Sequence, residues 1–140
     1  MFVETITYKG YNGETYTEDF MFNISEAELI KMNYTTPGGM KEFLTRITKE
    51  KDTVKLYNNF ENLLLMSYGR VSLDGKRFEK NEVMREEFKQ TDAYSKLIMK
   101  LLGDAKHAAK FVQGIMPENS ISDAEVSRVT AEVLPTNISQ

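Results

Sequence analysis

The single histidine is the first candidate for chemistry, because the chain contains no cysteine. The lack of cysteine excludes disulfides, thiol nucleophiles and thiolate ligands for a metal. His107 stands among alanines on an expected helix that starts after Asp104, and no Ser, Asp or Glu accompanies it in a nucleophile or zinc-binding motif. We therefore interpret His107 as a surface or boundary residue. The sequence predicts a protein that is not an enzyme and that uses no cofactor and no metal.

Loops that cradle phosphate or calcium are not indicated either. The glycines form neither GxGxxG nor GxxxxGK[ST], the two spacings typical of phosphate-binding loops. Residues 72–77 (Ser-Leu-Asp-Gly-Lys-Arg) lack the alternating carboxylates of an EF-hand. We interpret this segment as a structural turn in which Asp74 and Gly75 reverse the chain and Phe78 anchors it. The predicted turn motif consists of Ser72, Asp74, Gly75 and Phe78.

Charge argues against a nucleic-acid partner. The net charge is −3, and the N-terminal 24 residues hold one base against four acids. Those acids (Glu4, Glu14, Glu18 and Asp19) would repel phosphate from the expected hairpin. Glu26, Glu28, Glu86 and Glu87 fall at helix starts or on exposed helix faces, where solvation explains them. No basic stripe of the kind that nucleic-acid-binding proteins show is present in the sequence.

Length and composition indicate one ordinary globular domain. The chain has 140 residues, of which 41% are apolar and 28% are charged. No apolar run approaches the roughly 20 residues that a membrane-spanning helix needs. Met1 leads into Phe-Val-Glu-Thr-Ile, which does not have the features of a secretory signal. We therefore expect no membrane partner and a cytoplasmic location.

The elements that must position any site begin with a β-hairpin over residues 1–24. Phe2, Ile6 and Tyr8 share one face at period two, and Asn12-Gly13 is a strong signal for a type I′ hairpin turn. On the return strand, Tyr16, Phe20, Phe22 and Ile24 share one face. Two strands alone are marginal in water, so we expect the hairpin to pack on helices or to extend the sheet of a partner subunit.

Residues 25–117 predict a compact bundle of short helices. Ser25 to Glu28 form a capping box. A second helix is expected over 40–50, and a third from its cap at Asp52 or Thr53 to a stop at Gly69. A loop or small hairpin follows at 70–80. Three more helices are expected, the first capped by Asn81, the second capped by Thr91 and ending at Gly103, and the third capped by Asp104 with stops at Gly114 and Pro117. The predicted fold class is mainly α (α+β), with hairpin 1–24 and bundle 25–117 in a single globular domain over 1–117.

Residues 118–140 predict a flexible or weakly helical C-terminal tail. Val126, Val129 and Val133 trace one narrow apolar stripe, but β-branched residues make a poor autonomous helix. Such a segment is mobile alone and available to dock on a partner.

Several distinct short motifs are spaced along the chain. They are Tyr68-Gly69, then residues 72–80 (SLDGKRFEK), then Phe88 with Ala93-Tyr94-Ser95 and Leu97, then Phe111, Gly114 and Pro117, preceded by residues 11–13 (YNG), 20–25 (FMFNIS) and 27–29 (AEL). In these motifs, which span most of residues 5–117, the chain resembles the tail assembly chaperones of long-tailed phages that infect Gram-positive bacteria.

The resemblance implies a factor made in the cytoplasm of the infected host cell and absent from the mature virion. Such proteins coat the long, mostly helical tape measure protein and keep it soluble until tube protein displaces them. In many phages a programmed frameshift near the end of the gene yields a longer form, and residues 117–140 lie where that junction would fall. Self-association into a ring or spiral would add avidity along such a rod.

Contact with the tape measure protein is expected at Val126, Val129, Val133 and Leu134, in the manner of a helix in a groove. The alternative is that this stripe folds back on its own domain. Two other functions stay open. A small structural subunit of the phage tail or head-tail connector would persist in purified particles. An enzyme or a nucleic-acid-binding regulator would need a chemical constellation or a basic face, and the sequence has neither.

Overall fold

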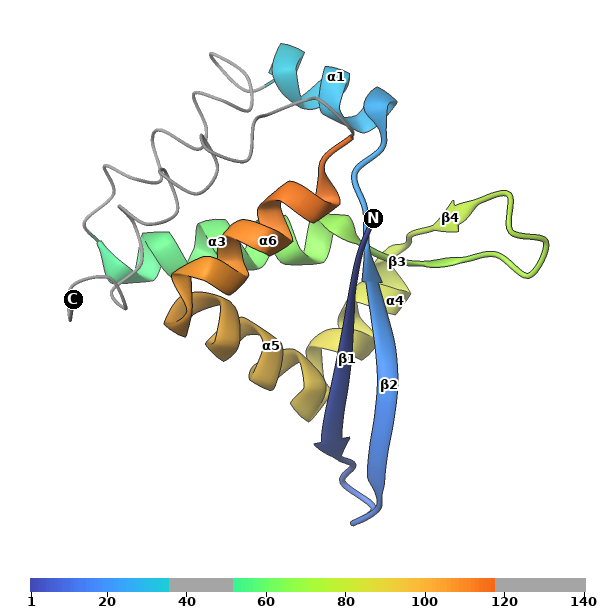
Figure 1. Cartoon of the computed structure of the whole chain (residues 1–140), viewed down its shortest axis with the longest axis vertical. Helices are drawn as coiled ribbons and strands as arrows, with labels where there is room; N and C mark the ends of the chain where they lie inside the picture. The colour runs from blue at the N-terminus through green and yellow to red at the C-terminus, as the bar shows by residue number, and fades with distance from the viewer. Residues whose placement is uncertain (36–51, 118–140) are drawn as a thin grey trace.

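The computed structural model describes residues 1–35 and 52–117. Within these ranges the elements are β1 (Phe2–Lys9), β2 (Thr15–Phe22), α1 (Glu26–Thr35), α3 (Thr53–Ser67), β3 (Tyr68–Val71), β4 (Phe78–Glu79), α4 (Glu82–Lys89), α5 (Asp92–Gly103) and α6 (Ala105–Ile115). Figure 1 shows the long β1–β2 hairpin with α5 and α6 beside it, and the β3–β4 hairpin projecting to one side. The expected helix over 40–50 and the tail over 118–140 lie outside the described residues.

The N-terminal hairpin is confirmed, but its turn type is not. β1 and β2 pair without interruption from Phe2 opposite Phe22 to Lys9 opposite Thr15. The Gly13 N–H donates to the Gly10 carbonyl at 3.0 Å, so the turn centres on residues 11–12, not on Asn12-Gly13. Gly13 follows with φ of 87° and the Gly10 N–H donates to the Glu14 carbonyl, which is a three-residue loop with a glycine bulge. The type I′ prediction is therefore wrong.

The prediction of a mainly α fold is also wrong, because the hairpin is one half of a four-stranded antiparallel sheet in the order β1-β2-β3-β4. α3 ends at Ser67 and the chain continues directly into β3, where Tyr68 pairs with Phe22 and Gly69 with Met21. Gly69 is thus a strand residue and not a helix stop. The fold is α+β, with an antiparallel sheet that carries helices.

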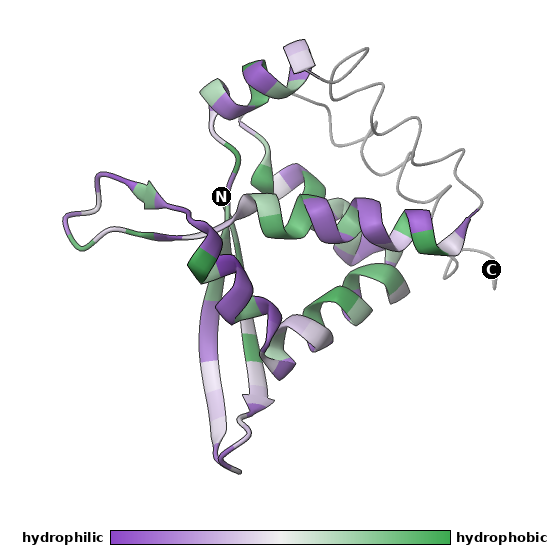
Figure 2. Ribbon diagram, turned by 180° about the vertical axis from the view of Figure 1, so that it is seen from behind, coloured by the Kyte–Doolittle hydropathy of each residue, from purple (hydrophilic) through white to green (hydrophobic). Residues whose placement is uncertain are grey.

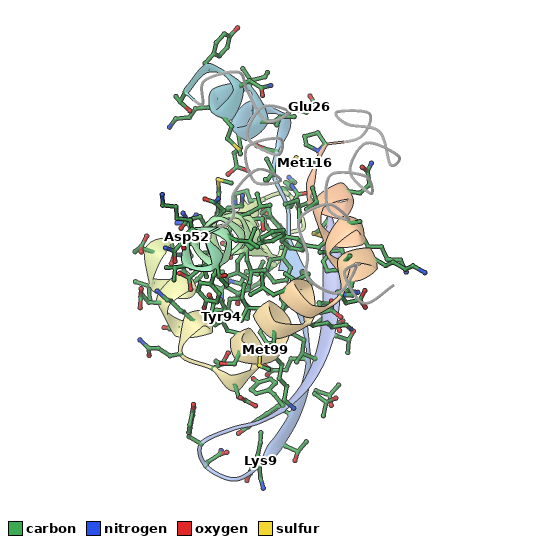
Figure 3. The ribbon with its side chains drawn as sticks, turned by 90° about the vertical axis from the view of Figure 1, so that its left-hand side faces the viewer. Lys9, Glu26, Asp52, Tyr94, Met99 and Met116 are labelled. Atoms are coloured by element: carbon green, nitrogen blue, oxygen red, sulfur yellow. The ribbon has the colours of Figure 1, made fainter. Side chains whose placement is uncertain are left out.

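One apolar core joins this sheet to the helices. Side chains with at most 2% exposure come from β2, from α3, α5 and α6, and from the segment between β2 and α1. They include Phe22, Ile24, Leu64, Leu101 and Phe111. Aromatic rings connect the elements: Tyr68 stacks on Phe88 with centroids 4.3 Å apart, and Phe22 meets Phe111 edge-on at 5.7 Å. Figure 3 shows side chains crowded between the hairpin and the helices, with Lys9 at the distal end of the hairpin.

The predicted helix caps are confirmed. Asp52, Asn81, Thr91 and Asp104 each accept a hydrogen bond from a backbone N–H two or three residues further on. Helical spacing predicts Ala105, Ala108, Ala109, Phe111 and Val112 as the apolar face of α6, and all five are buried. The same spacing predicts Val54 as the first apolar position of α3, but Val54 is exposed and Leu56 is buried instead.

Candidate functional site

The residues predicted from the sequence as sites fall in two places. Val126, Val129, Val133 and Leu134 lie outside the described residues, so that contact surface stays a prediction. The turn residues Ser72, Asp74, Gly75 and Phe78 lie together in the projecting β3–β4 hairpin, residues 70–79, which we call the arm.

A network of hydrogen bonds closes the tip of the arm. The Ser72 hydroxyl donates to Asp74 at 2.6 Å and accepts from the Arg77 N–H at 3.0 Å, while Asp74 also accepts from the Lys76 N–H at 3.0 Å. The hydrogen bond from Ser72 and that from the Lys76 N–H hold the pKa of Asp74 below its usual value. Gly75 has φ of 76°, the region that favours glycine. The tip is therefore a fixed turn.

Phe78 and Lys80 connect the base of the arm to α1. A Cβ placed on Gly69 would lie 2.6 Å from the Phe78 ring, so the ring covers β3 where a side chain is missing. The Lys80 ammonium lies 5.9 Å from the centre of that ring and donates to both carboxylate oxygens of Glu28, at 2.9 and 2.8 Å. Glu28 also completes the predicted capping box with Ser25. This ion pair spans 52 positions of the chain, and no local pattern pointed to it.

The outer surface of the arm is basic and apolar. Leu73 is fully exposed at the tip and Val71 is partly exposed beside it. Arg70 and Arg77 are each 68% exposed although both lie near Glu79, at 3.0 and 3.5 Å. Figure 2 shows hydrophilic and hydrophobic residues side by side along the arm. Leu73 is the most exposed of the large apolar side chains in residues 1–35 and 52–117.

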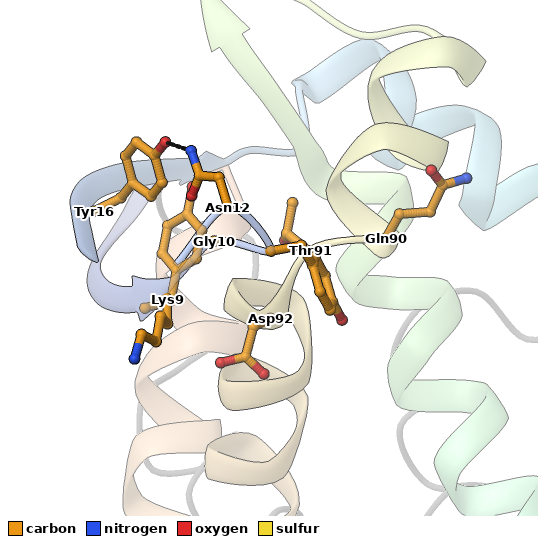
Figure 4. Close-up of a pocket in the computed structure, with 9 residues that line it drawn as sticks. Lys9, Gly10, Asn12, Tyr16, Gln90, Thr91 and Asp92 are labelled. Atoms are coloured by element: carbon orange, nitrogen blue, oxygen red, sulfur yellow. Dashed lines mark hydrogen bonds between the residues drawn. The ribbon is translucent and has the colours of Figure 1, made fainter. Parts of the chain in front are cut away.

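A second feature is a cleft between the end of the β1–β2 hairpin and the α4–α5 junction (Figure 4). Its cavity of about 360 Å³ is lined by Tyr8, Lys9, Gly10, Tyr11, Asn12, Tyr16, Gln90, Thr91 and Asp92. Tyr11 is 92% exposed, and the Tyr16 hydroxyl accepts from the Asn12 amide at 2.7 Å. The Tyr8 hydroxyl donates to Glu18, and this bond, with burial, raises the pKa of Tyr8 to about 12. The cleft is thus lined by three tyrosine side chains, Tyr8, Tyr11 and Tyr16.

Two further polar contacts join elements that are distant in sequence. His107 has a side chain that is 17% exposed and meets Glu4 of β1, whose carboxylate also lies 3.5 Å from the Lys100 ammonium. In the interior, burial raises the pKa of Tyr94, and its hydrogen bond to Glu61 raises it further. Across residues 1–35 and 52–117 no three His, Asp or Glu side chains gather as a metal site would require. No helix in those same ranges is long and apolar enough to cross a membrane.

The comparison with known families decides the assignment. Residues 1–138 match the family described as phage tail assembly chaperone. The chain belongs to that family. No curated protein and no solved structure matches it. Phage tail assembly chaperones are not a class of enzymes, and the match covers both the arm and the valine stripe of residues 118–138.

Sequence reasoning missed two parts of this tail assembly chaperone's surface. The sequence indicates Leu73 only as part of a turn, because the spacing within residues 72–77 does not show which side chain points outward. The cleft combines residues 8–16 with residues 90–92, and no spacing in the sequence brings those segments together.

Proposed function

We propose that this tail assembly chaperone binds the tape measure protein of its phage and keeps it soluble in the host cytoplasm, and that it is absent from the mature virion. The observation that carries the proposal is the family match over nearly the whole chain, residues 1–138. The sequence adds a tail with a narrow apolar stripe, a pattern that docks on a partner in the manner of a helix in a groove.

The proposed role requires contacts that are numerous and weak. A tape measure protein is a long amphipathic rod whose apolar face would otherwise aggregate, and its chaperone has to leave when tube protein arrives. We place the contact on Val126, Val129, Val133 and Leu134, because a narrow valine stripe forms a helix only marginally without a partner. We further propose that copies self-associate into a ring or spiral, which adds avidity, and that a frameshifted longer form accompanies this one.

Co-expression with the tape measure protein tests the proposal. We expect the full chain to bring the tape measure protein into the soluble fraction and to co-purify with it. A triple variant with Val126→Asp, Val129→Asp and Val133→Asp is expected to lose this activity. The matched control with Ser127→Asp, Thr130→Asp and Asn137→Asp adds the same charge to the same segment and is expected to retain it.

Each outcome has a distinct reading. If both triple variants solubilise the tape measure protein, its contact lies on the body and not on the valine stripe. If the unaltered chain fails to solubilise it and is instead found in purified virions, the chaperone role is wrong and the protein is a small structural subunit of the tail or head-tail connector.

A further inference from the structure

Helices α5 and α6 form a basic surface. Residues 92–115 hold four lysines against two aspartates, whereas residues 1–24 of the hairpin hold one lysine against four acids. All four of these helical lysines are exposed. Within residues 1–35 and 52–117, Lys100 alone of the four forms an ion pair, with Glu4 at 3.5 Å, while Lys96 donates to the neutral carbonyl of Thr7. Most of the positive charge on these helices is therefore unpaired within the described part of the chain.

The lysines lie on neighbouring stretches of the two helices, which we call the lysine face: Lys96, Met99 and Lys100 of α5 with Lys106 and Lys110 of α6. Spacings of three and four residues place side chains on one side of a helix, and Met99 is 71% exposed between two of the lysines. Lys100 and His107 both contact the Glu4 carboxylate, so the two stretches lie close together. Figure 1 shows α5 and α6 on the side of the hairpin away from the arm.

The C-terminal segment of the same chain has the complementary chemistry. Residues 118–140 hold four acids, Glu118, Asp123, Glu125 and Glu132, against the single base Arg128. Three of the acids recur every seven residues, a spacing that aligns side chains along one side of a helix. Two of them directly precede Val126 and Val133 of the valine stripe. Acidic and apolar side chains would therefore reach a partner surface together, and the lysine face offers a match for both.

The segment is long enough to reach the lysine face of its own chain. It follows α6 directly, and the 11 residues of α6 span roughly 16 Å at 1.5 Å per residue. Residues 118–140 would span roughly 35 Å even as a continuous helix. Folded back along α6, the segment passes Lys110 first and Lys106 next, and then reaches α5. The arm is a poorer match for acids, because Arg70 and Arg77 already lie beside Glu79.

We propose that residues 118–140 dock on the lysine face of their own chain, with Glu125 beside Lys110 and Glu132 beside Lys106. This inference rests on the proposed function, which assigns the valine stripe to the tape measure protein, and it adds the regulation of that stripe. Docking covers the valines until the tape measure protein displaces the segment. Exposed ion pairs are individually weak, so the contact is readily reversed, and the covalent tether supplies the effective concentration that it needs.

Nuclear magnetic resonance with a nitroxide spin label tests the contact on the full chain without any tape measure protein. Because the chain has no cysteine, Ser127→Cys provides a single site for the label. We expect the label to broaden the amide signals of Met99, His107 and Ala109 and to leave that of Leu73 in the arm sharp. The broadening should disappear at about 1 M salt, where the screening length falls to about 3 Å.

Charge reversal on the lysine face provides the decisive variant. Lys106→Glu with Lys110→Glu, in the labelled chain, is expected to abolish the broadening, since neither lysine has an ion-pair partner among the described residues whose loss would disturb the fold. Lys55→Glu with Lys89→Glu makes the same change of charge on exposed positions of α3 and α4 and is expected to keep the broadening. Unchanged signals of Leu101 and Phe111 show that each variant is folded. Broadening that is absent from the unaltered body, or that persists in the Lys106 and Lys110 variant, overturns the proposal.

A mixed sample identifies which chain supplies the segment. Isotope-labelled chains without nitroxide are combined with nitroxide-bearing chains that carry no isotope, and we expect no broadening of the lysine face. Broadening in this mixture would show that another copy occupies the face, which also overturns the proposal.

The failures of this contact and of the proposed function are separable. If the tape measure protein becomes soluble on co-expression while the nitroxide broadens nothing on the lysine face, the docking is wrong and the chaperone role stands. If the broadening appears but the tape measure protein stays insoluble, the docking stands and the chaperone role fails. The Lys106 and Lys110 variant is expected to solubilise the tape measure protein at least as well as the unaltered chain, and a loss of solubilisation would contradict the regulatory role.

Discussion

At the scale of single residues, two contacts determine how the arm is attached, one at Gly69, which precedes it in the chain, and one at Glu28 of α1. Gly69 lets β4 approach β3, since a Cβ there would lie 2.5 Å from the Glu79 carbonyl oxygen and 2.6 Å from the Phe78 ring. Glu28 receives the Lys80 ammonium from the other end of the arm. Neither residue makes a large contribution to the buried apolar core, yet each controls a contact between segments that are distant in sequence.

Gly69→Ala is expected to destabilise the protein by about 1–3 kcal/mol, because the backbone of β4 has to move to accommodate the new methyl group. Gly103→Ala is the matched control: an added Cβ there meets nothing within 4 Å, and alanine at the end of α5 is expected to be neutral or stabilising by up to about 1 kcal/mol. Urea denaturation measures both free energies of unfolding. Equal effects of the two substitutions would contradict the close approach of β4 to β3.

The Glu28 carboxylate predicts a specific pH dependence. Burial alone would raise its pKa, but hydrogen bonds from Lys80 and Ser25 outweigh burial and leave the pKa below the ordinary 4.5. Because the folded-state pKa is depressed, the stabilisation is fully present above pH 4.5 and is lost as the pH falls through the folded-state pKa. Glu28→Gln keeps a capping side chain without the charge, so it should be less stable than the unaltered chain at pH 7.

The Glu28 side chain is 42% exposed, so this difference is expected to stay below about 1 kcal/mol. Free energies of unfolding at pH 7, 5, 4 and 3 measure it. The gap between the two proteins should narrow only at the acidic end of the series. A gap of constant size across the whole series would show that the charge of Glu28 contributes nothing.

At the scale of elements, α1 is the most weakly attached helix among those described. None of its side chains is fully buried, although Leu29 and Met32 pack against the core at its margin. Its capping box and the Lys80 pair tie its first turn to the rest of the protein, and the Lys80 side chain is only 11% exposed. α1 is therefore held by this ion pair together with the marginal packing of Leu29 and Met32.

Lys80→Met is expected to loosen α1 selectively. Amide hydrogen exchange of residues 29–35 should accelerate several-fold, while exchange in α5, whose inner face is fully buried, should not change. Lys55→Met, on the exposed side of α3, is the matched control and should leave both helices unchanged. Unaltered exchange in α1 of the Lys80 variant would show that the ion pair does not hold this helix.

Elements defined by local contacts could be predicted from the sequence, and those defined by distant contacts could not. The caps at Asn81, Thr91 and Asp104 were predicted correctly, since each is a side chain bonding to backbone two or three residues away. The small hairpin predicted as one alternative for residues 70–80 is confirmed by the pairing of β3 with β4. The helix predicted to run to Gly69 is wrong at its end, because Tyr68 follows the helical period of α3 and only its distant partner Phe22 makes it a strand residue. The outward position of Leu73 depends on where the sheet places the arm.

At the scale of the whole molecule, the described residues share one core. Phe22 of β2, Leu64 of α3, Leu101 of α5 and Phe111 of α6 are all completely buried, and the Ile24 N–H donates to the Ile115 carbonyl at 2.7 Å. A single domain over residues 1–117 is still a prediction, which the cooperativity of unfolding tests. If the sheet and the helices form one cooperative unit, they lose their structure together.

Leu101→Ala provides that test, because Leu101 is buried at the centre of the helical side of the core. The substitution is expected to cost about 2–5 kcal/mol through lost burial and an unfilled cavity, whereas Val83→Ala on the exposed face of α4 should stay within about 0.5 kcal/mol. In the Leu101 variant, hydrogen exchange at Ile6 in β1 and at Phe111 in α6 should report the same reduced free energy of opening. If Ile6 instead kept its original protection while Phe111 lost its own, the hairpin and the helices would be separate units, and the arm would be carried by a sheet that folds independently of them.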